Sequence, residues 1–204
     1  MIDRRTIRTG LKVIAAVDSD VAAALEKVGY PEPRIRPAGF ETLFSIIVSQ
    51  QISTGAARTI MGRVRSLLQD LSAEATLALP EGALGEAGLS RRKAEYATGL
   101  ARTILEGRFD PATLAGLGDN EAIAAICTLH GFGRWSAEIY VMFSLQRPDV
   151  FPADDLALQR ALQNLKGWSK RPAAAEAREA VVHWSPWRTV GSLFLWHFYR
   201  AAPI

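Results

Sequence analysis

The stretch from Leu129 to Asp155, LHGFGRWSAEIYVMFSLQRPDVFPADD, does most to determine the expected fold and chemistry. It begins with a Gly-x-Gly turn between two helical patterns, and it ends with two aspartates directly before a further helical pattern. The segment between them has the apolar spacing of an amphipathic helix and carries three aromatic side chains, Trp135, Tyr140 and Phe143. One short segment therefore combines a tight turn, an aromatic surface and two carboxylates.

The glycine turn predicts a site for a phosphate group. Gly131 and Gly133, on either side of Phe132, let the backbone turn tightly and bring its amides close to a partner. A helix begins directly after the turn, so unpaired N–H groups and the positive end of the helix dipole point outward there. Arg134 can add a charge and Ser136 a hydroxyl. The alternative interpretation is an ordinary corner between two helices, with the glycines present only for packing.

The bulk composition permits a nucleic-acid-binding protein and excludes several other classes. The 204 residues suffice for one domain or two tightly joined lobes, and 49% of them are hydrophobic. The net charge of +3 is compatible with nucleic acid as a partner. The single cysteine, Cys127, excludes an internal disulfide framework and a four-cysteine metal site. No apolar run reaches about 18 residues, so the sequence predicts neither a secretion signal nor a membrane span.

Helical patterns follow one another along almost the whole chain, and no alternation typical of a strand stands out. Ser53, Ser90 and Asp119 are predicted N-caps, and Gly29 is a predicted C-cap. The sequence therefore predicts an all-α fold, with helices near residues 11–29, 40–50, 54–69, 72–79, 81–87, 91–107, 121–130, 155–165, 172–184 and 187–200.

Several motifs resemble those of one enzyme superfamily. LHGFGRWSA resembles the helix-hairpin-helix of the base-excision DNA glycosylases, whose pattern is apolar-x-Gly-apolar-Gly-x-x-(Ser or Thr)-Ala. Three other segments are similar to the same superfamily and follow in the expected order: FETLFSIIVSQQISTGAARTIMGRV, LSRRKAEYATGLARTILEG and VFPADDLALQRAL. The C-terminal WSPWRTVGSLFLWHFYR resembles the 3-methyladenine glycosylase II, or AlkA-type, branch. The resemblance covers residues 38–200 and implies a two-lobed helical HhH-GPD fold with an active-site cleft between the lobes.

The resemblance also implies a domain organisation and a partner. A single glycosylase domain would span residues 1–204, with one lobe from 1–38 and 151–204 and the other from 39–150, which contains the helix-hairpin-helix at about 121–145. The implied partner is double-stranded DNA containing damaged bases, bound by a monomer in the cytoplasm at the nucleoid. The three histidines, His130, His183 and His197, show no metal-ligand spacing. We therefore expect no metal and no other cofactor.

The resemblance assigns the catalytic role to Asp155. The family's aspartate stands five residues before a basic residue in the next helix, and Asp155 has this spacing to Arg160. A carboxylate near a helix N-terminus stays ionised, and a fixed negative charge stabilises the oxocarbenium-like sugar that forms as a base leaves. The alternative is that the two aspartates only cap the helix, and this is what we expect for Asp154.

Trp135 indicates that the reaction does not include a strand-cleavage step. In the bifunctional members of the superfamily, this position holds a lysine that attacks the sugar and forms an imine. An indole cannot form an imine, so the resemblance implies base removal without strand cleavage.

The resemblance places Gln51 at the position of the residue that fills the gap left by a flipped base; the alternative is a solvent-facing loop glutamine. Trp135 and Trp196 are implied to line the base pocket, together with Tyr140 and Ile139. Electron-rich indoles attract a cationic alkylated purine. The alternative for each tryptophan is core packing.

The expected activity is removal of alkylated purines, of the 3-methyladenine and 7-methylguanine type, from duplex DNA by base flipping. The product would be an abasic site in base-excision repair. Two alternatives stay open: a glycosylase for another lesion, such as ethenoadenine, hypoxanthine, uracil or an oxidised purine, and a non-catalytic helix-hairpin-helix DNA-binding module. The basic side chains with a possible DNA role are Arg58, Arg63, Arg91, Arg92, Lys93 and Arg134.

Overall fold

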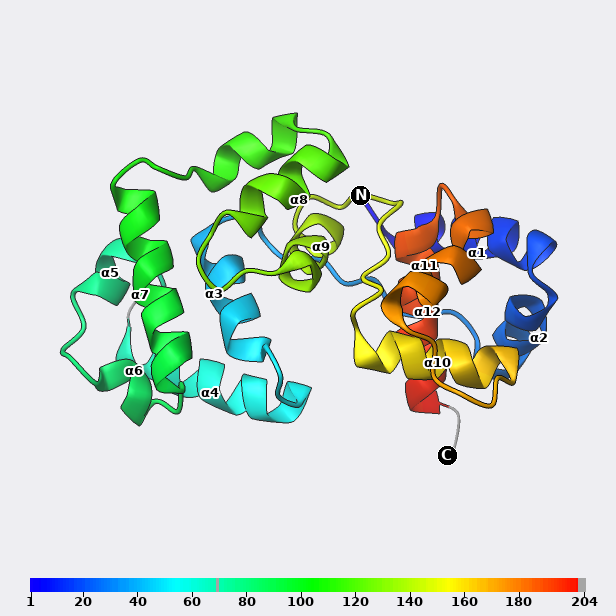
Figure 1. Ribbon diagram of the computed structural model, residues 1–204, viewed down its shortest axis with the longest axis horizontal. Helices are drawn as coiled ribbons and strands as arrows, with labels where there is room; N and C mark the ends of the chain where they lie inside the picture. The colour runs from blue at the N-terminus through cyan, green and yellow to red at the C-terminus, as the bar shows by residue number, and fades with distance from the viewer. Residues whose placement is uncertain (69, 202–204) are drawn as a thin grey trace. The chain divides into compact units, whose positions relative to one another are not determined.

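The computed structural model describes residues 1–68 and 70–201, and regular structure in these residues is entirely helical. It comprises twelve α-helices, α1 to α12, and two short 3-10 helices, η1 and η2 (Figure 1). The predicted all-α fold is confirmed. The expected helix end near Gln69 lies outside the described residues. None of the helices in the described part of the chain combines the length and apolar character that crossing a bilayer requires.

The chain divides into two compact units. Unit 1 comprises Met1–Ile35 and Val141–Ile204, and unit 2 comprises Arg36–Tyr140. The chain passes between the units in the linker after Ile35 and again within helix α9 (Arg134–Phe143), whose last three residues are assigned to unit 1.

Unit 2 is organised around the apolar helix α3. α3 packs against α4 and α7, and α7 in turn packs against α5 (Figure 1). Six of the ten α3 residues are buried, including Leu43, Phe44 and Ile47. The helices of this unit are α3 (Phe40–Ser49), α4 (Thr54–Leu67), α5 (Ala73–Leu77), α6 (Ala83–Glu86), α7 (Arg91–Leu105), η1 (Pro111–Gly116), α8 (Asp119–Cys127) and the start of α9.

Two of the three predicted N-caps in unit 2 are confirmed. The Ser53 and Ser90 hydroxyls accept the backbone N–H groups of Ala56 and Lys93 at the starts of α4 and α7. The prediction for Asp119 is wrong, because α8 begins one residue earlier, with Gly118 as its N-cap. The Glu121 carboxylate accepts the N–H of this N-cap residue, Gly118, at 2.9 Å. A glutamate three residues after the N-cap is a common partner for that amide.

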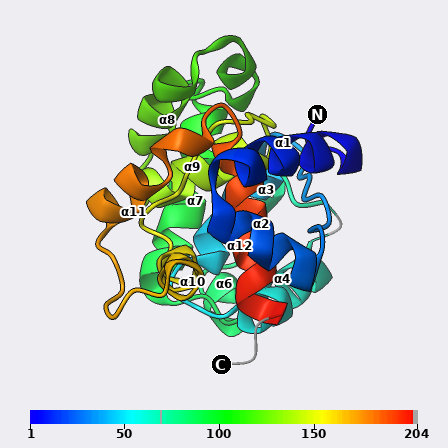
Figure 2. The same ribbon diagram turned by 90° about the vertical axis from the view of Figure 1, so that its right-hand side faces the viewer.

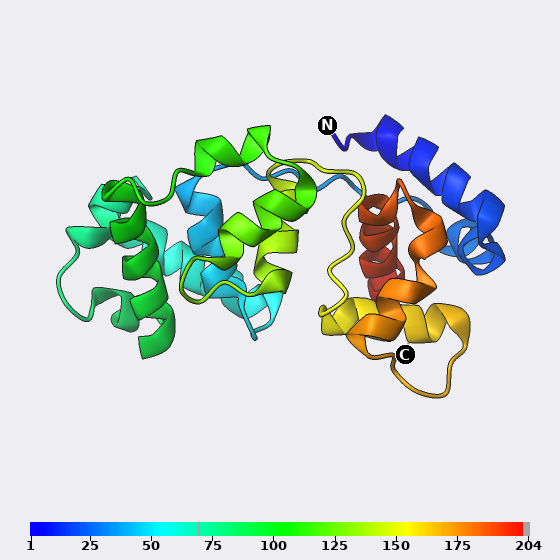
Figure 3. The same cartoon turned by 45° about the horizontal axis from the view of Figure 1, so that its top comes forward.

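Unit 1 is organised around α12. Its buried residues run from Thr189 to Leu195, and it packs against α10, α1 and α2 (Figures 2 and 3). The helices of this unit are α1 (Arg4–Val17), α2 (Ser19–Val28), α10 (Leu156–Lys166), α11 (Ala174–Ala180), η2 (Val182–Trp184) and α12 (Arg188–Ala201).

The single helix predicted for residues 11–29 is in fact two helices, which meet at Asp18. The Asp18 side chain is 1% exposed and caps α2 by accepting the Val21 N–H. It also accepts hydrogen bonds from Lys166 Nζ at 2.7 Å and Trp184 Nε1 at 2.8 Å. The cap at Asp18 is a local signal that the prediction missed, whereas the partners Lys166 and Trp184 lie far along the sequence and could not be predicted. The predicted C-cap at Gly29 is confirmed, with φ at 71° and its N–H bonded to the Leu25 carbonyl.

Candidate functional site

The hairpin between α8 and α9 is a tight turn that requires Gly131. This residue has φ at +88°, in the region that favours glycine. A Cβ built on it would also lie 2.3 Å from the ring of Tyr96. Gly133 differs, because it does not have a positive φ and a Cβ there would meet no atom within 4 Å. Sequence analysis treated the two glycines alike, whereas the structure requires glycine only at the first.

The start of α9 presents some of the predicted phosphate-binding residues and buries others. Gly133 and Arg134 are exposed, and Arg134 Nε donates to the buried Glu138 carboxylate at 2.9 Å. The Phe132 side chain is buried, so only its backbone belongs to the turn surface. Ser136 is 3% exposed, and its hydroxyl oxygen accepts a hydrogen bond from the Gln50 side chain at 3.1 Å. The expectation that Ser136 faces a phosphate therefore finds no support in these contacts.

Gln51 lies at the exposed loop between α3 and α4. Its φ is +56°, an unusual value for a residue other than glycine. The neighbouring Gln50 donates from Nε2 to the Gly131 carbonyl at 2.9 Å. The loop that holds the predicted wedge is therefore hydrogen-bonded to the predicted phosphate-binding hairpin.

Asp155 is the N-cap of α10, where its carboxylate has defined partners. Its Oδ1 atom accepts hydrogen bonds from the Leu158 N–H at 3.0 Å and from Trp196 Nε1 at 3.2 Å. The preceding turn is held by Gln159, whose buried amide donates to the Ala153 carbonyl at 2.7 Å. The prediction that Asp154 caps this helix is wrong. Helix α10 begins at Leu156, so Asp155 is its N-cap, and Asp154 lies one residue before the cap with an exposed side chain.

Trp196, which donates to the Asp155 carboxylate, also contacts an aromatic ring and a cation within unit 1. Its indole lies 5.8 Å from the Phe143 ring, centroid to centroid. The guanidinium carbon of Arg34 lies over the same indole at 5.5 Å from its centroid. The structure thus brings together two predicted site residues, Asp155 and Trp196, and adds Arg34, which sequence analysis did not single out.

The other predicted pocket residues all lie on α9. Trp135 is half-buried in its first turn, and Ile139 is buried. Tyr140 is fully buried, and its hydroxyl oxygen accepts the Gly39 N–H at 2.8 Å. Burial raises the pKa of this phenol above its ordinary value, although the Gly39 bond opposes the shift. These contacts favour a structural role for Tyr140, as an anchor for the start of α3.

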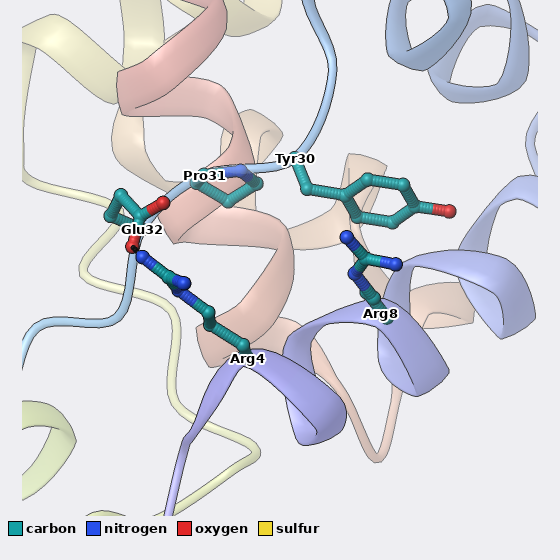
Figure 4. A pocket seen from close by; sticks show the side chains of 5 residues that line it. All are labelled: Arg4, Arg8, Tyr30, Pro31 and Glu32. Carbon is teal, nitrogen blue, oxygen red and sulfur yellow. Dashed lines mark hydrogen bonds and ion pairs between the residues drawn. The ribbon is translucent and has the colours of Figure 1, made fainter.

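A cavity of about 230 Å³ also lies in unit 1, lined by Arg4, Arg8, Tyr30, Pro31 and Glu32 (Figure 4). Within it, Arg4 pairs with Glu32 and the Arg8 guanidinium lies over the Tyr30 ring. None of the predicted site residues lines it.

A chain whose described residues form only helices, with a glycine hairpin at a helix N-terminus and a helix-capping carboxylate beside an indole, fits the class of helix-hairpin-helix DNA repair proteins. The comparisons are specific on this point. Residues 44–186 match the HhH-GPD superfamily of base excision DNA repair proteins. The chain belongs to this superfamily, in its 3-methyladenine DNA glycosylase branch.

Three relatives illustrate the match. The alkylbase DNA glycosidase-like protein mag2 of Schizosaccharomyces pombe is 25% identical, over 91% of this chain and 90% of its own. The solved structure of the same organism's 3-methyladenine DNA glycosylase, Mag1, in complex with abasic DNA has a TM-score of 0.87 at 25% identity, covering 92% and 95%. A DNA-3-methyladenine glycosidase from Bacillus halodurans is 34% identical with a TM-score of 0.75, covering 92% and 87%.

Proposed function

We propose that this protein is a monofunctional DNA glycosylase that hydrolyses the N-glycosidic bond of alkylated purines in duplex DNA and leaves an abasic site. The observation that carries the proposal is the Asp155 carboxylate, held at the start of α10 by the Leu158 N–H and the Trp196 indole. Two of the relatives named above are 3-methyladenine glycosylases by name, and one of them was solved with abasic DNA, the product of such a reaction.

Asp155 would act on the sugar. Loss of the base leaves positive charge on the sugar ring, and a fixed carboxylate stabilises that charge as it develops. The same carboxylate can orient the attacking water and take up its proton. The hydrogen bonds from Leu158 and Trp196 hold the carboxylate in one orientation, which the reaction needs.

The substrate class follows from how easily the base leaves. Alkylation at N3 or N7 gives a purine a positive charge, so the C1′–N bond breaks without a strong general acid. An indole face attracts such a base by on the order of 1–2 kcal/mol when water is excluded. These features support an alkylated purine as the substrate.

Trp135 stands where an imine-forming lysine would be needed for strand cleavage. This residue supports hydrolysis of the N-glycosidic bond without cleavage of the DNA strand.

DNA would be held by the exposed start of α9. Gly133 and Arg134 lie there, at the positive end of the dipole of that helix. A phosphate of the damaged strand is the natural ligand for this arrangement. We propose that the protein binds duplex DNA as a monomer.

One observation favours a second candidate, a glycosylase for neutral lesions such as hypoxanthine or ethenoadenine. The Arg34 guanidinium already lies over Trp196 at 5.5 Å from the ring centroid. A resident cation on one face of an indole lowers the attraction of the ring for a cationic base, and stacking of a neutral base on the other face does not depend on that attraction.

The test is base release from a set of duplexes that each carry one lesion: 3-methyladenine, 7-methylguanine, hypoxanthine, ethenoadenine, uracil or 8-oxoguanine. We expect release of the alkylated purines, with strand breaks only after alkali. Release confined to the neutral bases would favour the second candidate. Breaks without alkali would contradict the monofunctional assignment, and no release from any duplex would leave a non-catalytic DNA-binding module.

A further inference from the structure

The C-terminal end of α3 is closed by a lysine from another helix. The last carbonyls of a helix have no partner within it, and a cation there also compensates the negative end of the dipole. Lys93, in the first turn of α7, donates from Nζ to the Val48 carbonyl at 2.7 Å and to the Gln50 carbonyl at 2.6 Å. Partial burial lowers the pKa of this ammonium. Lys93 therefore acts inside the protein, rather than as the DNA contact that its place in a basic run had indicated.

The residue that Lys93 holds is itself bonded to the hairpin. Gln50 uses its carbonyl for Lys93 and its side-chain amide for the Gly131 carbonyl and the Ser136 hydroxyl, at 2.9 and 3.1 Å. One residue thus connects α7, the α3–α4 loop and both sides of the glycine turn. All these contacts lie within unit 2.

Gln51 follows directly, with a left-handed φ of +56° and an exposed side chain. Such a conformation in a residue other than glycine persists only where the surrounding structure fixes it. The bonds to Gln50 supply this constraint on one side, and the Ser53 cap of α4 supplies it on the other. The strained residue is therefore held out at the surface by the same network that reaches the hairpin.

We propose that Lys93 and Gln50 are positioning residues that lock the Gln51 loop to the Gly131 hairpin. The predicted wedge, Gln51, and the predicted phosphate-binding hairpin then keep a fixed position relative to each other. This inference rests on the proposed function, because it assumes that the protein flips a base. Extruding a paired base is costly, and a wedge fixed before binding avoids the further loss of loop entropy. Without the lock, Gln51 would have to be ordered during each flipping event.

A positioning role for Lys93 and Gln50 affects base flipping and bond cleavage differently, whereas a purely structural role would affect both steps alike. Flipping depends on the wedge, whereas bond cleavage depends on Asp155. Loss of the lock should therefore slow release from a fully paired duplex far more than from the same lesion inside a bubble of mismatched bases, where pairing no longer opposes extrusion.

The experiment measures single-turnover release of one lesion from the paired duplex and from the bubble, with Lys93→Met and Gln50→Met. Both changes keep an unbranched apolar stem and remove the donors. We expect the paired-duplex rate to fall about tenfold or more, with less than about threefold change in the bubble. Lys93→Arg, which keeps a donor, should recover part of the loss. Lys12→Met, at an exposed lysine of α1, removes the same charge and should change neither rate.

Thermal unfolding shows whether each variant is folded. If the Lys93→Met protein does not fold, the comparison of the two substrates is made with Gln50→Met. Equal slowing on both substrates, or no slowing, in a folded variant would overturn the proposal. Wild-type protein that releases no base from either substrate would instead overturn the proposed function, so the two failures are distinguishable.

Discussion

At the scale of single residues, Asp155 caps helix α10, and this position is compatible with the action on a substrate that we propose for it. Its Oδ1 atom accepts from Leu158 and Trp196, and these bonds fix the direction of the carboxylate. The resemblance to the glycosylase family singled out Asp155, whereas the cap was assigned to Asp154, because two adjacent aspartates fit a cap equally well. The Trp196 bond could not be predicted, since it joins residues 41 positions apart and depends on how α12 packs against α10.

Trp196→Phe tests the bond between indole and carboxylate. Phenylalanine keeps an aromatic ring but cannot donate to Asp155, and a hydrogen bond to a charged group contributes roughly 1.5–3 kcal/mol. We expect the single-turnover rate of base release to fall about tenfold to a hundredfold. Trp168→Phe, at an exposed tryptophan, is the matched control. A Trp196→Phe enzyme as fast as the wild type would show that this bond has no part in catalysis.

At the scale of elements, the glycine hairpin could be predicted as a turn, but not the different demands on its two glycines. Gly131 needs its positive φ and its contact with Tyr96, a residue of α7. That contact is set by tertiary packing, so no sequence spacing reveals it. The buried partners of Asp18, at the junction of α1 and α2, were missed for the same reason, because they come from α10 and η2.

The two glycines give a contrast that unfolding experiments can measure. Gly131→Ala forces an L-residue into a left-handed φ and against the Tyr96 ring, so we expect a loss of about 2 kcal/mol or more in the free energy of unfolding. Gly133→Ala meets open space and should change it by less than about 0.5 kcal/mol. Urea unfolding of both variants measures these changes in the free energy of unfolding. Equal changes for Gly131→Ala and Gly133→Ala would contradict the different roles assigned to the two glycines.

At the scale of the molecule, sequence analysis predicted the helical class and the order of the helices, because amphipathic spacing and caps are local. It could not predict the buried network of unit 1. Asp18 accepts a hydrogen bond from Lys166 at Oδ1 and one from Trp184 at Oδ2, and Oδ2 also lies 3.0 Å from His183 Nε2. This one carboxylate therefore connects the α1–α2 junction, the end of α10 and η2.

Asp18 predicts how stability depends on acid. Burial alone would raise the pKa of this carboxyl, but the bonds from Lys166, Trp184 and His183 outweigh it and lower the pKa from 3.8 to about 2. A lowered pKa stabilises the folded state above pH 3.8, by about 2 kcal/mol, and this contribution is lost as pH falls toward 2.

Asp18→Asn should remove this contribution at neutral pH and flatten the fall in stability between about pH 4 and pH 2. Asp20→Asn is the control, because Asp20 also pairs with Lys166 but is half exposed. Chemical unfolding at several pH values would measure both variants. An Asp18→Asn curve parallel to that of the wild type through this range would contradict the assignment.

The most direct test of the whole account is Asp155→Asn, assayed for base release and for duplex binding in parallel. Asparagine is as good an N-cap as aspartate, so α10 should still form, and the hairpin of unit 2 is unchanged. The account predicts that release of the alkylated base is abolished while affinity for lesion-bearing duplex stays at the wild-type level. Base release at the wild-type rate by a folded Asp155→Asn protein would contradict it.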